Sequence, residues 1–569
     1  MNKLIIILLS CIVSIFFHSC SIDEDITTAL PPKIILDNET GIYTVKQGRK
    51  IVIAPKYQSA EGATYLWTME GEVLGTSPSL LFMKEEIGEY YIKIAVRNES
   101  GIDEKEIRID VVDLEIPVFS IACKKNVTIA LGSELELRAS LRSTSLPTEF
   151  MWSVNGNKVS EEVSYTFYPD VIGLYTIVAT ASNDDGIHSE TINVNVLNAE
   201  DLPFVWDFGD YELHTTEDRK LLIKPLAISD VGDIEYTWFN EQKEVLGSDT
   251  QFVFLSDNQG NYIITAEARR DGSLLCSHTF NITVYEERAY YRSPTAVSKT
   301  YWNKVFEYTP APGQFINELK TGGFDSFHTT PEAAVTYAES RMGNANWVSL
   351  GGFGGFLTVG FDHSIDNSGD YDLGVIGNAF DGSSEPGIVW VMQDENGNGL
   401  PDDTWYELAG SESSEAGTIR NYSVTYYRPS ASAMPVQWSD NLGNFGEIDY
   451  LKQFHTQDSY YPMWINEESY TLSGTRLEPR NYDNSGDGSY WVQPHYDWGY
   501  ADNFSPFDYS SSDKANLFKI SNAIDFEGVP VNLSHIDFVK VQCAVNAKSG
   551  WLGEISTEVC GFYDYNLSK

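Results

Sequence analysis

One short acidic segment carries the residue types that bind a hard cation. Side-chain oxygens alternate with glycines in the run Asp394-Glu-Asn-Gly-Asn-Gly-Leu-Pro-Asp-Asp403. Calcium takes about six to eight oxygen ligands, and a glycine within such a run permits the tight bend that gathers them. We therefore expect a Ca²⁺ site that pins a loop. Its expected ligands are Asp394, Asn396, Asn398, Asp402 and Asp403.

The run resembles the first positions of an EF-hand or thrombospondin-type calcium loop, but it is incomplete. Trp405 stands where an EF-hand has its bidentate glutamate, so Glu407 or a distant carboxylate would have to complete the ligand shell. A plain asparagine-glycine hairpin between two strands is the alternative interpretation. A weaker second version runs from Asp483 to Ser489, where we expect a surface loop.

An aromatic interval from Phe454 to Tyr509 is the second candidate site. Its tyrosines and tryptophans stand among Asn, Asp, Ser, Gly and Pro, with poor strand alternation. Aromatic side chains on loops provide contact area at low entropic cost, and polar neighbours orient a ligand. The alternative is that they cover the end of a sandwich as a satellite core. The expected ligand-binding residues are Trp464, Trp491, His495, Tyr496, Trp498, Tyr500, Asp502 and Asn503.

Motifs for catalysis are missing from the sequence. It has no nucleophile elbow, no zinc-protease helix motif and no phosphate loop. Among 82 acidic residues, chance carboxylate pairs carry little information. We expect a binding protein rather than an enzyme.

The cysteines are sparse, and two lie in neighbouring β-like segments near the C-terminus. An oxidising compartment would permit a disulfide between Cys543 and Cys560. No cysteine and histidine spacing typical of a metal site occurs.

The N-terminus has the pattern of a secretory signal. Lys3 precedes an apolar run from Leu4 to Phe17, and Ser19 stands directly before Cys20. A cysteine at that place is typical of a lipoprotein signal, so we expect acyl chains on Cys20 to be the membrane anchor. The acidic residues that follow resemble the export tag of Bacteroidetes surface lipoproteins, which implies the outer face of the outer membrane. An ordinary secreted protein with a chance cysteine is the alternative.

The amino-acid composition limits the fold classes and the binding partners that we expect. Aromatic residues make up 13% of the 569 residues, which favours β structure. The formal net charge of -44 repels phosphates, so we expect neither nucleic acid nor anionic lipid surfaces as partners.

A repeat organises the first half of the chain. Trp67, Trp152 and Trp238 are separated by 85 and 86 residues, and each is followed 21 or 22 residues later by Gly-x-Tyr. This predicts a small sandwich with a Trp buried on a central strand and a Tyr on a facing strand. The repeats resemble PKD-like immunoglobulin domains and are expected to form a stalk, with glycan binding by each repeat as the alternative.

Beyond about residue 290 the repeat stops, and nine of the 13 Trp occur there. Strand patterns recur through this region, with one short helix expected at Pro331–Ala338. The predicted fold is all-β, with three tandem Ig-like/PKD-like β-sandwiches followed by a larger jelly-roll-like β-sandwich. The expected segments are a signal peptide at 1–19, an acidic tether at 20–30, PKD-like domains at 31–114, 115–199 and 200–287, and a ligand-binding domain at 288–569.

Several motifs of the C-terminal region occur together. They are Tyr308–Asn317, the glycine-rich run Gly351–Asp362, Gly377-Asn-Ala-Phe380, the run Asn396–Leu408 and Gly550–Cys560. The combination resembles the BtuH family of vitamin B12-binding surface lipoproteins of Bacteroidetes, over most of 300–563. The resemblance implies that the C-terminal domain captures cobalamin or other cobamides and passes them to an outer-membrane TonB-dependent transporter complex.

A carbohydrate-binding surface lipoprotein is the alternative function. A corrin ring is a broad, partly apolar plate fringed by amides, and a sugar ring is also met by an aromatic face with polar neighbours. The sequence pattern is therefore compatible with both ligands.

Overall fold

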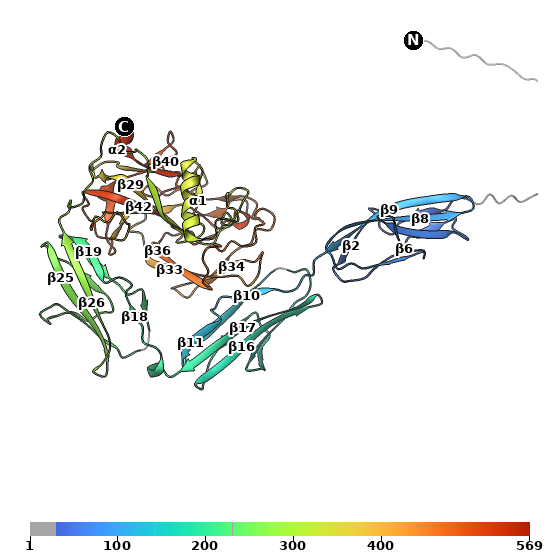
Figure 1. The fold of residues 1–569 in the computed structure, drawn as a ribbon, viewed down its shortest axis with the longest axis horizontal. Helices are drawn as coiled ribbons and strands as arrows, with labels where there is room; N and C mark the ends of the chain where they lie inside the picture. The colour runs from blue at the N-terminus through green and yellow to red at the C-terminus, as the bar shows by residue number, and fades with distance from the viewer. Residues whose placement is uncertain (1–29, 143, 230–231) are drawn as a thin grey trace, which may run out of the picture. The chain divides into compact units, whose positions relative to one another are not determined.

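The computed structural model describes residues 30–569 except 143 and 230–231. The signal peptide, Cys20 and nearly all of the acidic tether lie outside the described residues. The chain divides into two compact units, residues 1–115 and 116–569. It is all-β, with three Ig-like sandwiches followed by a larger β-sandwich region (Figure 1).

The first Ig-like domain has a five-stranded sheet in the order β2-β9-β8-β5-β6. Paired short strands, β1 with β4 and β3 with β7, form the opposite side of the core. The strands are β1 (Lys33–Ile35), β2 (Ile42–Lys46), β3 (Ile51–Ile53), β4 (Lys56–Gln58), β5 (Thr64–Met69), β6 (Glu72–Gly75), β7 (Leu80–Phe82), β8 (Gly88–Asn98) and β9 (Gly101–Val112).

The second and third Ig-like domains repeat this plan, with five-stranded sheets β11-β17-β16-β13-β14 and β19-β26-β25-β22-β23. The second contains β10 (Phe119–Ile121), β11 (Asn126–Ala130), β12 (Leu135–Leu141), β13 (Glu149–Val154), β14 (Asn157–Ser160), β15 (Ser164–Phe167), β16 (Gly173–Asn183) and β17 (Gly186–Leu197). The third contains β18 (Trp206–Asp207), β19 (Glu212–Thr216), β20 (Leu221–Ile223), β21 (Ala227–Ile228), β22 (Glu235–Phe239), β23 (Val245–Gly247), β24 (Phe252–Phe254), β25 (Gly260–Arg270) and β26 (Ser273–Tyr285).

The repeated tryptophan is the centre of each Ig-like core. Trp67, Trp152 and Trp238 are fully buried. Each indole N–H donates to a backbone carbonyl 10 or 11 residues later, at 2.8–3.0 Å. A buried indole needs such a partner because an unpaired N–H in a core is costly. The expectation of a core tryptophan is therefore confirmed.

The repeated tyrosine occupies a different place from the one expected. Tyr90 is on β8, which pairs directly with the tryptophan strand β5 in one sheet, so the tyrosine is not on a facing strand. Its hydroxyl donates to the carbonyl of Glu86, four residues upstream. Tyr175 and Tyr262 repeat this bond at the same spacing. The Gly-x-Tyr motif therefore marks a tyrosine corner that closes the turn before a long strand.

The C-terminal region is built on a six-stranded sheet in the order β27-β29-β42-β31-β32-β41. A four-stranded sheet, β39-β40-β30-β44, shares one hydrophobic core with it. A second four-stranded sheet, β35-β34-β33-β36, covers a separate core. The strands are β27 (Lys304–Thr309), β28 (Val348–Ser349), β29 (Phe356–Asp366), β30 (Leu373–Ile376), β31 (Gly387–Met392), β32 (Trp405–Leu408), β33 (Ile419–Tyr427), β34 (Val436–Asp440), β35 (Phe445–Ile448), β36 (Ser469–Arg476), β37 (Tyr482–Asp483), β38 (Trp491–Val492), β39 (Tyr509–Ser510), β40 (Ala515–Phe518), β41 (Ala523–Ile524), β42 (His535–Cys543), β43 (Glu558–Val559) and β44 (Gly561–Asp564).

The expected helix is present and longer than predicted. Helix α1 (Pro331–Gly343) begins after Thr330, whose side chain accepts the N–H of Ala333, and proline occupies its first position (Figure 1). Both features favour a helix start. A second, four-residue helix, α2 (Tyr565–Ser568), ends the chain. Among the described residues, no helix is long and apolar enough to cross a membrane.

We expect Trp67→Ala to lower the free energy of unfolding of the 30–115 segment by about 3–5 kcal/mol, the usual cost of truncating a large aromatic side chain in a packed core. Urea titration followed by circular dichroism measures it. Val73→Ala is the matched control in the same domain, because Val73 is 63% exposed and surface changes usually stay within about 0.5 kcal/mol. Equal effects of the two substitutions would contradict the central role of Trp67.

Candidate functional site

The C-terminal region contains a cavity of about 1060 Å³, which we call the aromatic cavity. This volume is slightly above the range of about 300–1,000 Å³ for small-molecule sites. Five separate chain segments form its walls. Its lining residues are Tyr301, Trp302, Met342, Gly343, Ala345, Trp347, Ile376, Gly377, Asn378, Ala379, Phe380, Phe504, Tyr509, Ser511, Lys514, Cys560 and Gly561.

Backbone bonds and ring contacts hold the walls of the aromatic cavity in place. The N–H of Trp302 donates to the carbonyl of Phe562, which fixes the segment before β27 beside β44. The rings of Phe504 and Tyr509 lie 4.9 Å apart, and the Tyr509 hydroxyl donates to the carbonyl of Ala379 at 3.3 Å. These contacts position the walls before any ligand binds.

The side chains that line the aromatic cavity are largely apolar, with a few polar groups among them. Six of the lining residues are aromatic, and Lys514 is the one cation among them. At the rim, Phe380 is 63% exposed and Tyr301 is 57% exposed. Exposed rings beside a concave surface are typical of a binding site, because burying them against a ligand is favourable.

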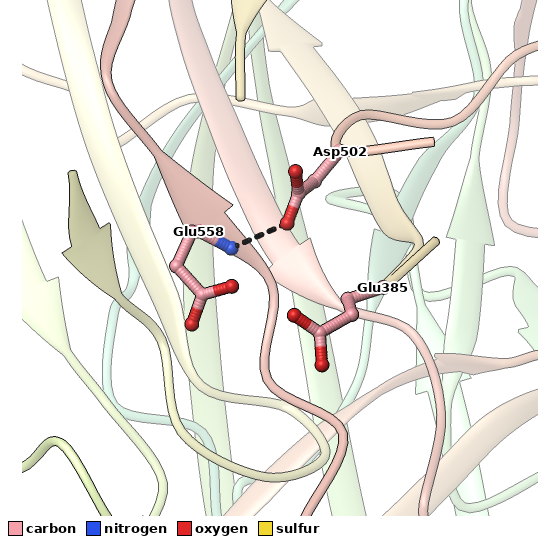
Figure 2. A group of neighbouring side chains, drawn as sticks. All are labelled: Glu385, Asp502 and Glu558. Carbon is pink, nitrogen blue, oxygen red and sulfur yellow. Dashed lines mark hydrogen bonds between the residues drawn. The ribbon is translucent and has the colours of Figure 1, made fainter. Parts of the chain in front are cut away.

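Behind one wall of the cavity lies a cluster of three carboxylates, the half-buried Glu385 with the buried Asp502 and Glu558 (Figure 2). One oxygen of each lies within 4.8 Å of the others, and Figure 2 shows the three side chains pointing toward one another. Asp502 accepts the N–H of Asn378 at 2.8 Å and the N–H of Glu558 at 2.9 Å. Asp502 therefore ties the cavity segment after β30 to strand β43.

Burial makes ionisation of this cluster unfavourable. Burial, reinforced by the Glu385 carboxylate, raises the pKa of Asp502 to about 8. Burial first, and then its two neighbours, raise the pKa of Glu558 well above its usual range, and burial also raises the pKa of Glu385. Carboxyls at such distances can share protons or hold a cation. Because both oxygens of Asp502 already accept backbone N–H groups, a shared proton explains the cluster with fewer assumptions.

The aromatic residues predicted from the sequence do not form one exposed surface. Trp464 belongs to the main core, and Tyr496 and Tyr500 belong to a smaller one. The Tyr496 hydroxyl donates to the carbonyl of Glu478, and the Tyr500 hydroxyl accepts the N–H of Glu412. Tyr496 and Tyr500 therefore match the satellite core that was the alternative interpretation, whereas Trp464 is part of the main core.

The other predicted residues are dispersed. Asn503 is fully buried and exchanges two hydrogen bonds with the backbone of Tyr496. His495 and Trp498 are exposed, and Trp491 is half-buried. Of the eight, Asp502 alone supports the aromatic cavity, from behind its wall.

Two aromatic residues of the same interval, Phe504 and Tyr509, do line the cavity. Sequence reasoning did not single out Trp302 and Trp347, because they belong to other segments. The sequence motif Gly377–Phe380 could have pointed to this cavity, because it forms part of the cavity wall.

A smaller cavity of about 410 Å³, which we call the sheet-face cavity, lies against the six-stranded sheet. Trp390, Glu407 and Lys540 are cross-strand neighbours there, since Trp390 pairs with both of the others. The ammonium of Lys540 lies 4.3 Å from the ring centre of Trp405, and burial lowers the pKa of Lys540 to about 8. This face therefore combines aromatic rings with polar groups.

Two polar atoms beside the sheet-face cavity lack partners. Within the described part of the chain, Trp390 Nε1 and Gln542 Oε1 are buried and have no hydrogen-bond partner. The Gln542 amide nitrogen is fixed, because it donates to the carbonyls of Gly354 and Ser473. Buried polar groups of this kind call for a ligand or water.

The five residues predicted to bind metal are brought together by the loop between β31 and β32. The Asn398 amide donates to Asp402, and the Asn396 amide donates to Asp403. The Gly399 N–H donates to Asp394 at 3.0 Å. Glu407, the suggested further ligand, instead accepts the hydroxyl of Thr475 and lines the sheet-face cavity.

The disulfide that the sequence would permit is not formed. Cys543 and Cys560 are both free thiols. The Cys543 sulfur points to the carbonyl of Ile555 at 3.4 Å, whereas the Cys560 sulfur points to the carbonyl of Gly377 at 3.8 Å. A disulfide needs two Cβ atoms that face each other. The positions of the two cysteines in the sequence did not predict that their side chains would point in different directions.

The carboxylate cluster predicts a pH dependence of stability. The folded cluster holds protons up to about pH 8, whereas the unfolded chain releases them near pH 4, so stability falls as pH rises between these values. Glu558→Gln removes one of these acids and should weaken that fall, with a melting temperature at pH 8 at least as high as that of the wild type. Thermal unfolding at several pH values measures it.

The exposed Glu415→Gln is the control and should leave the pH dependence unchanged. The opposite result, a loss of stability at pH 8 that a chelator reproduces in the wild type, would indicate a bound cation.

Comparisons with known proteins find matches to the Ig-like part of the chain. Residues 31–98 match the family model of the PKD-like domain, and no curated protein matches the chain. A three-domain Ig fragment of titin has 13% identity, covering 45% of this chain and 99% of its own, with a TM-score of 0.21. The three N-terminal domains of the Highly Immunogenic Outer Capsid protein of bacteriophage RB49 have 12% identity, 45% and 99% coverage and a TM-score of 0.22. Fibronectin(III)-like modules of Clostridium thermocellum CbhA have 15% identity, 30% and 98% coverage and a TM-score of 0.17. The chain thus has a PKD-like domain and tandem Ig-like domains.

Proposed function

We propose that this protein is a surface-exposed, lipid-anchored protein of the outer membrane that binds cobamides in the aromatic cavity. It delivers them to an outer-membrane TonB-dependent transporter complex. The observation that carries the proposal is the aromatic cavity itself, with its volume of about 1060 Å³ and its six aromatic lining residues. The resemblance of 300–563 to the BtuH family supports the choice of ligand.

The chemistry of a corrinoid suits this lining. The faces of Trp302 and Phe504 can pack on a broad, partly apolar ring system. Asn378 and Ser511 offer donors and acceptors to peripheral amides, and Lys514 offers a positive charge to the phosphodiester of the nucleotide loop. Each part of the ligand therefore has a matching group in the lining.

The absence of catalytic sequence motifs favours binding over turnover. The perturbed carboxyls Glu385, Asp502 and Glu558 lie behind the cavity wall, where the hydrogen bonds of Asp502 join backbone segments. Lys540, the perturbed amine, belongs to the sheet-face cavity and not to the aromatic cavity.

Calorimetric titration with cyanocobalamin tests this proposal on the chain from residue 30 onward. Trp302→Ala and Phe504→Ala should each weaken binding at least tenfold, as expected for aromatic anchors that contribute about 2 kcal/mol or more. Trp498→Ala is the matched control: this exposed residue was predicted from the sequence but lies outside the aromatic cavity. Binding lost in Trp498→Ala and kept in Trp302→Ala would contradict the assignment of the site, and no binding by the wild type would contradict the ligand.

Glycan binding at the sheet-face cavity is a second candidate function. The favouring observation is that Trp390 Nε1 and Gln542 Oε1 are buried without partners beside the half-buried ring of Trp405. Sugar rings offer both an apolar face and hydroxyl groups that could satisfy such atoms.

Affinity electrophoresis in gels containing neutral or acidic polysaccharides tests the second candidate. A retarded wild type and an unretarded Trp405→Ala variant are the expected results. Trp551→Ala is the control, since Trp551 is an exposed tryptophan of the same region that lies outside this cavity. Equal migration of the wild type and Trp405→Ala in every gel would contradict glycan binding here.

A further inference from the structure

The loop that joins β31 to β32 is closed by a regular strand pair. Met392 pairs with Trp405, so the residues between them form one long hairpin loop. A hairpin needs only a few residues to turn, so this loop is longer than the turn requires. Its extra length carries the acidic and amide side chains.

One carboxylate oxygen inside this loop has no partner. Asp394 is 5% exposed, and its Oδ2 accepts the N–H of Gly399 across the loop at 3.0 Å. This bond directs the carboxylate into the loop. Its Oδ1 is buried and has no hydrogen-bond partner among the described residues. An unsatisfied buried carboxylate oxygen is costly, so its position points to a cation.

Hydrogen bonds within the loop hold the other four polar side chains in place. Asp402 accepts the amide of Asn398 at 2.9 Å, and Asp403 accepts the amide of Asn396 at 3.2 Å and the N–H of Glu395 at 2.8 Å. The amide carbonyls of Asn396 and Asn398 each accept a backbone N–H, which leaves each carbonyl a second lone pair. One loop thus carries three carboxylates and two amide oxygens.

The two nearby arginines form ion pairs with other acids. Arg292 pairs with Asp537, whose other oxygen accepts the N–H of Asp394. Arg219 lies beside Glu287 and Glu395. Neither arginine has a contact with Asp394, Asp402 or Asp403 among the described ion pairs.

We propose that this loop binds one calcium ion through Asp394, Asp402 and Asp403, with the amide oxygens of Asn396 and Asn398. Every donor is an oxygen, which suits a hard cation and excludes the nitrogen and sulfur sites of zinc. Calcium is favoured over magnesium because an irregular loop with five side chains suits its larger, flexible ligand shell.

The ion also supports the junction between the third Ig-like domain and the C-terminal region. Arg219 of the third domain donates to Gln393, just before the loop, and lies 3.7 Å from Glu395 within it. Tyr290 packs so closely on Gly397 that a β-carbon there would lie 2.3 Å from the tyrosine ring. A loop held by calcium keeps these partners in place.

Calcium titration of the chelator-treated full chain tests the proposal. Isothermal calorimetry should find one site, and calcium should raise the melting temperature more than equimolar magnesium does. Calcium should also slow proteolysis near residues 286–300. Asp402→Asn preserves shape and should weaken calcium binding at least tenfold, and Asp394→Asn should do the same.

The control is Asp483→Asn in the similar loop at 483–489. There the two carboxylate oxygens accept N–H groups from Ser485 and Gly488, so no oxygen is left unpaired. This variant should bind calcium like the wild type. Extracellular calcium modules bind with Kd as weak as about 10⁻³ M, so no heat and no thermal shift at about 10 mM calcium would overturn the proposal. Loss of binding in Asp483→Asn with retention in Asp402→Asn would also overturn it. Neither outcome depends on cobamide binding.

Discussion

Buried carboxylates are the constraint on which the C-terminal region depends. An ionised carboxylate taken out of water is stable only if donors, a cation or a proton compensate for the lost hydration. Asp372 and Asp537 are fully buried. Asp372 accepts the backbone N–H of Ser368 in its own turn and that of the distant Ile520, and Asp537 pairs with Arg292. Each acid thereby fastens irregular chain to the strands, which explains how a region rich in loops keeps defined walls.

The same constraint shapes the proposed sites. Asp502 satisfies both its oxygens with backbone N–H groups, and in doing so it sets the wall of the aromatic cavity. Asp394 satisfies only one oxygen, and the unpaired one is directed into a loop rich in oxygens. Asp502 and Asp394 are both buried, but they differ in their hydrogen bonds. Two hydrogen-bonded oxygens give Asp502 a structural role, whereas the oxygen of Asp394 without a partner suits its proposed role as a ligand.

The Ig-like domains depend on a simpler arrangement. The repeated indole of each core donates to one carbonyl, and one tyrosine closes one corner, so the same few residues recur at nearly constant spacing. Such domains need few buried charges. The third of them meets the C-terminal region at Arg219, which donates to Gln393 and to the carbonyl of Asn532 and lies 3.7 Å from Glu395. The junction is therefore sensitive to the acidic loop beside it.

Local patterns determined much of this protein in advance. The spacing of Trp67, Trp152 and Trp238 predicted three sandwiches, and alternation predicted strands such as Gly387–Met392 with their observed bounds. The calcium-like loop was also visible, because its proposed ligands are neighbours in sequence. Such features depend on residues within one strand, turn or domain, where sequence distance and spatial distance agree.

Only the tertiary structure decided the candidate cavities. The aromatic cavity takes Trp302, Trp347, Phe380 and Phe504 from four segments, and no sequence period links them. The dense run at Tyr496 and Tyr500 looked like a binding surface, yet these rings fill a small core. An aromatic ring suits a core and a ligand equally well, so its type and spacing do not reveal which it contacts. That choice depends on which distant segments pack against it, and long-range packing is what the sequence pattern does not contain.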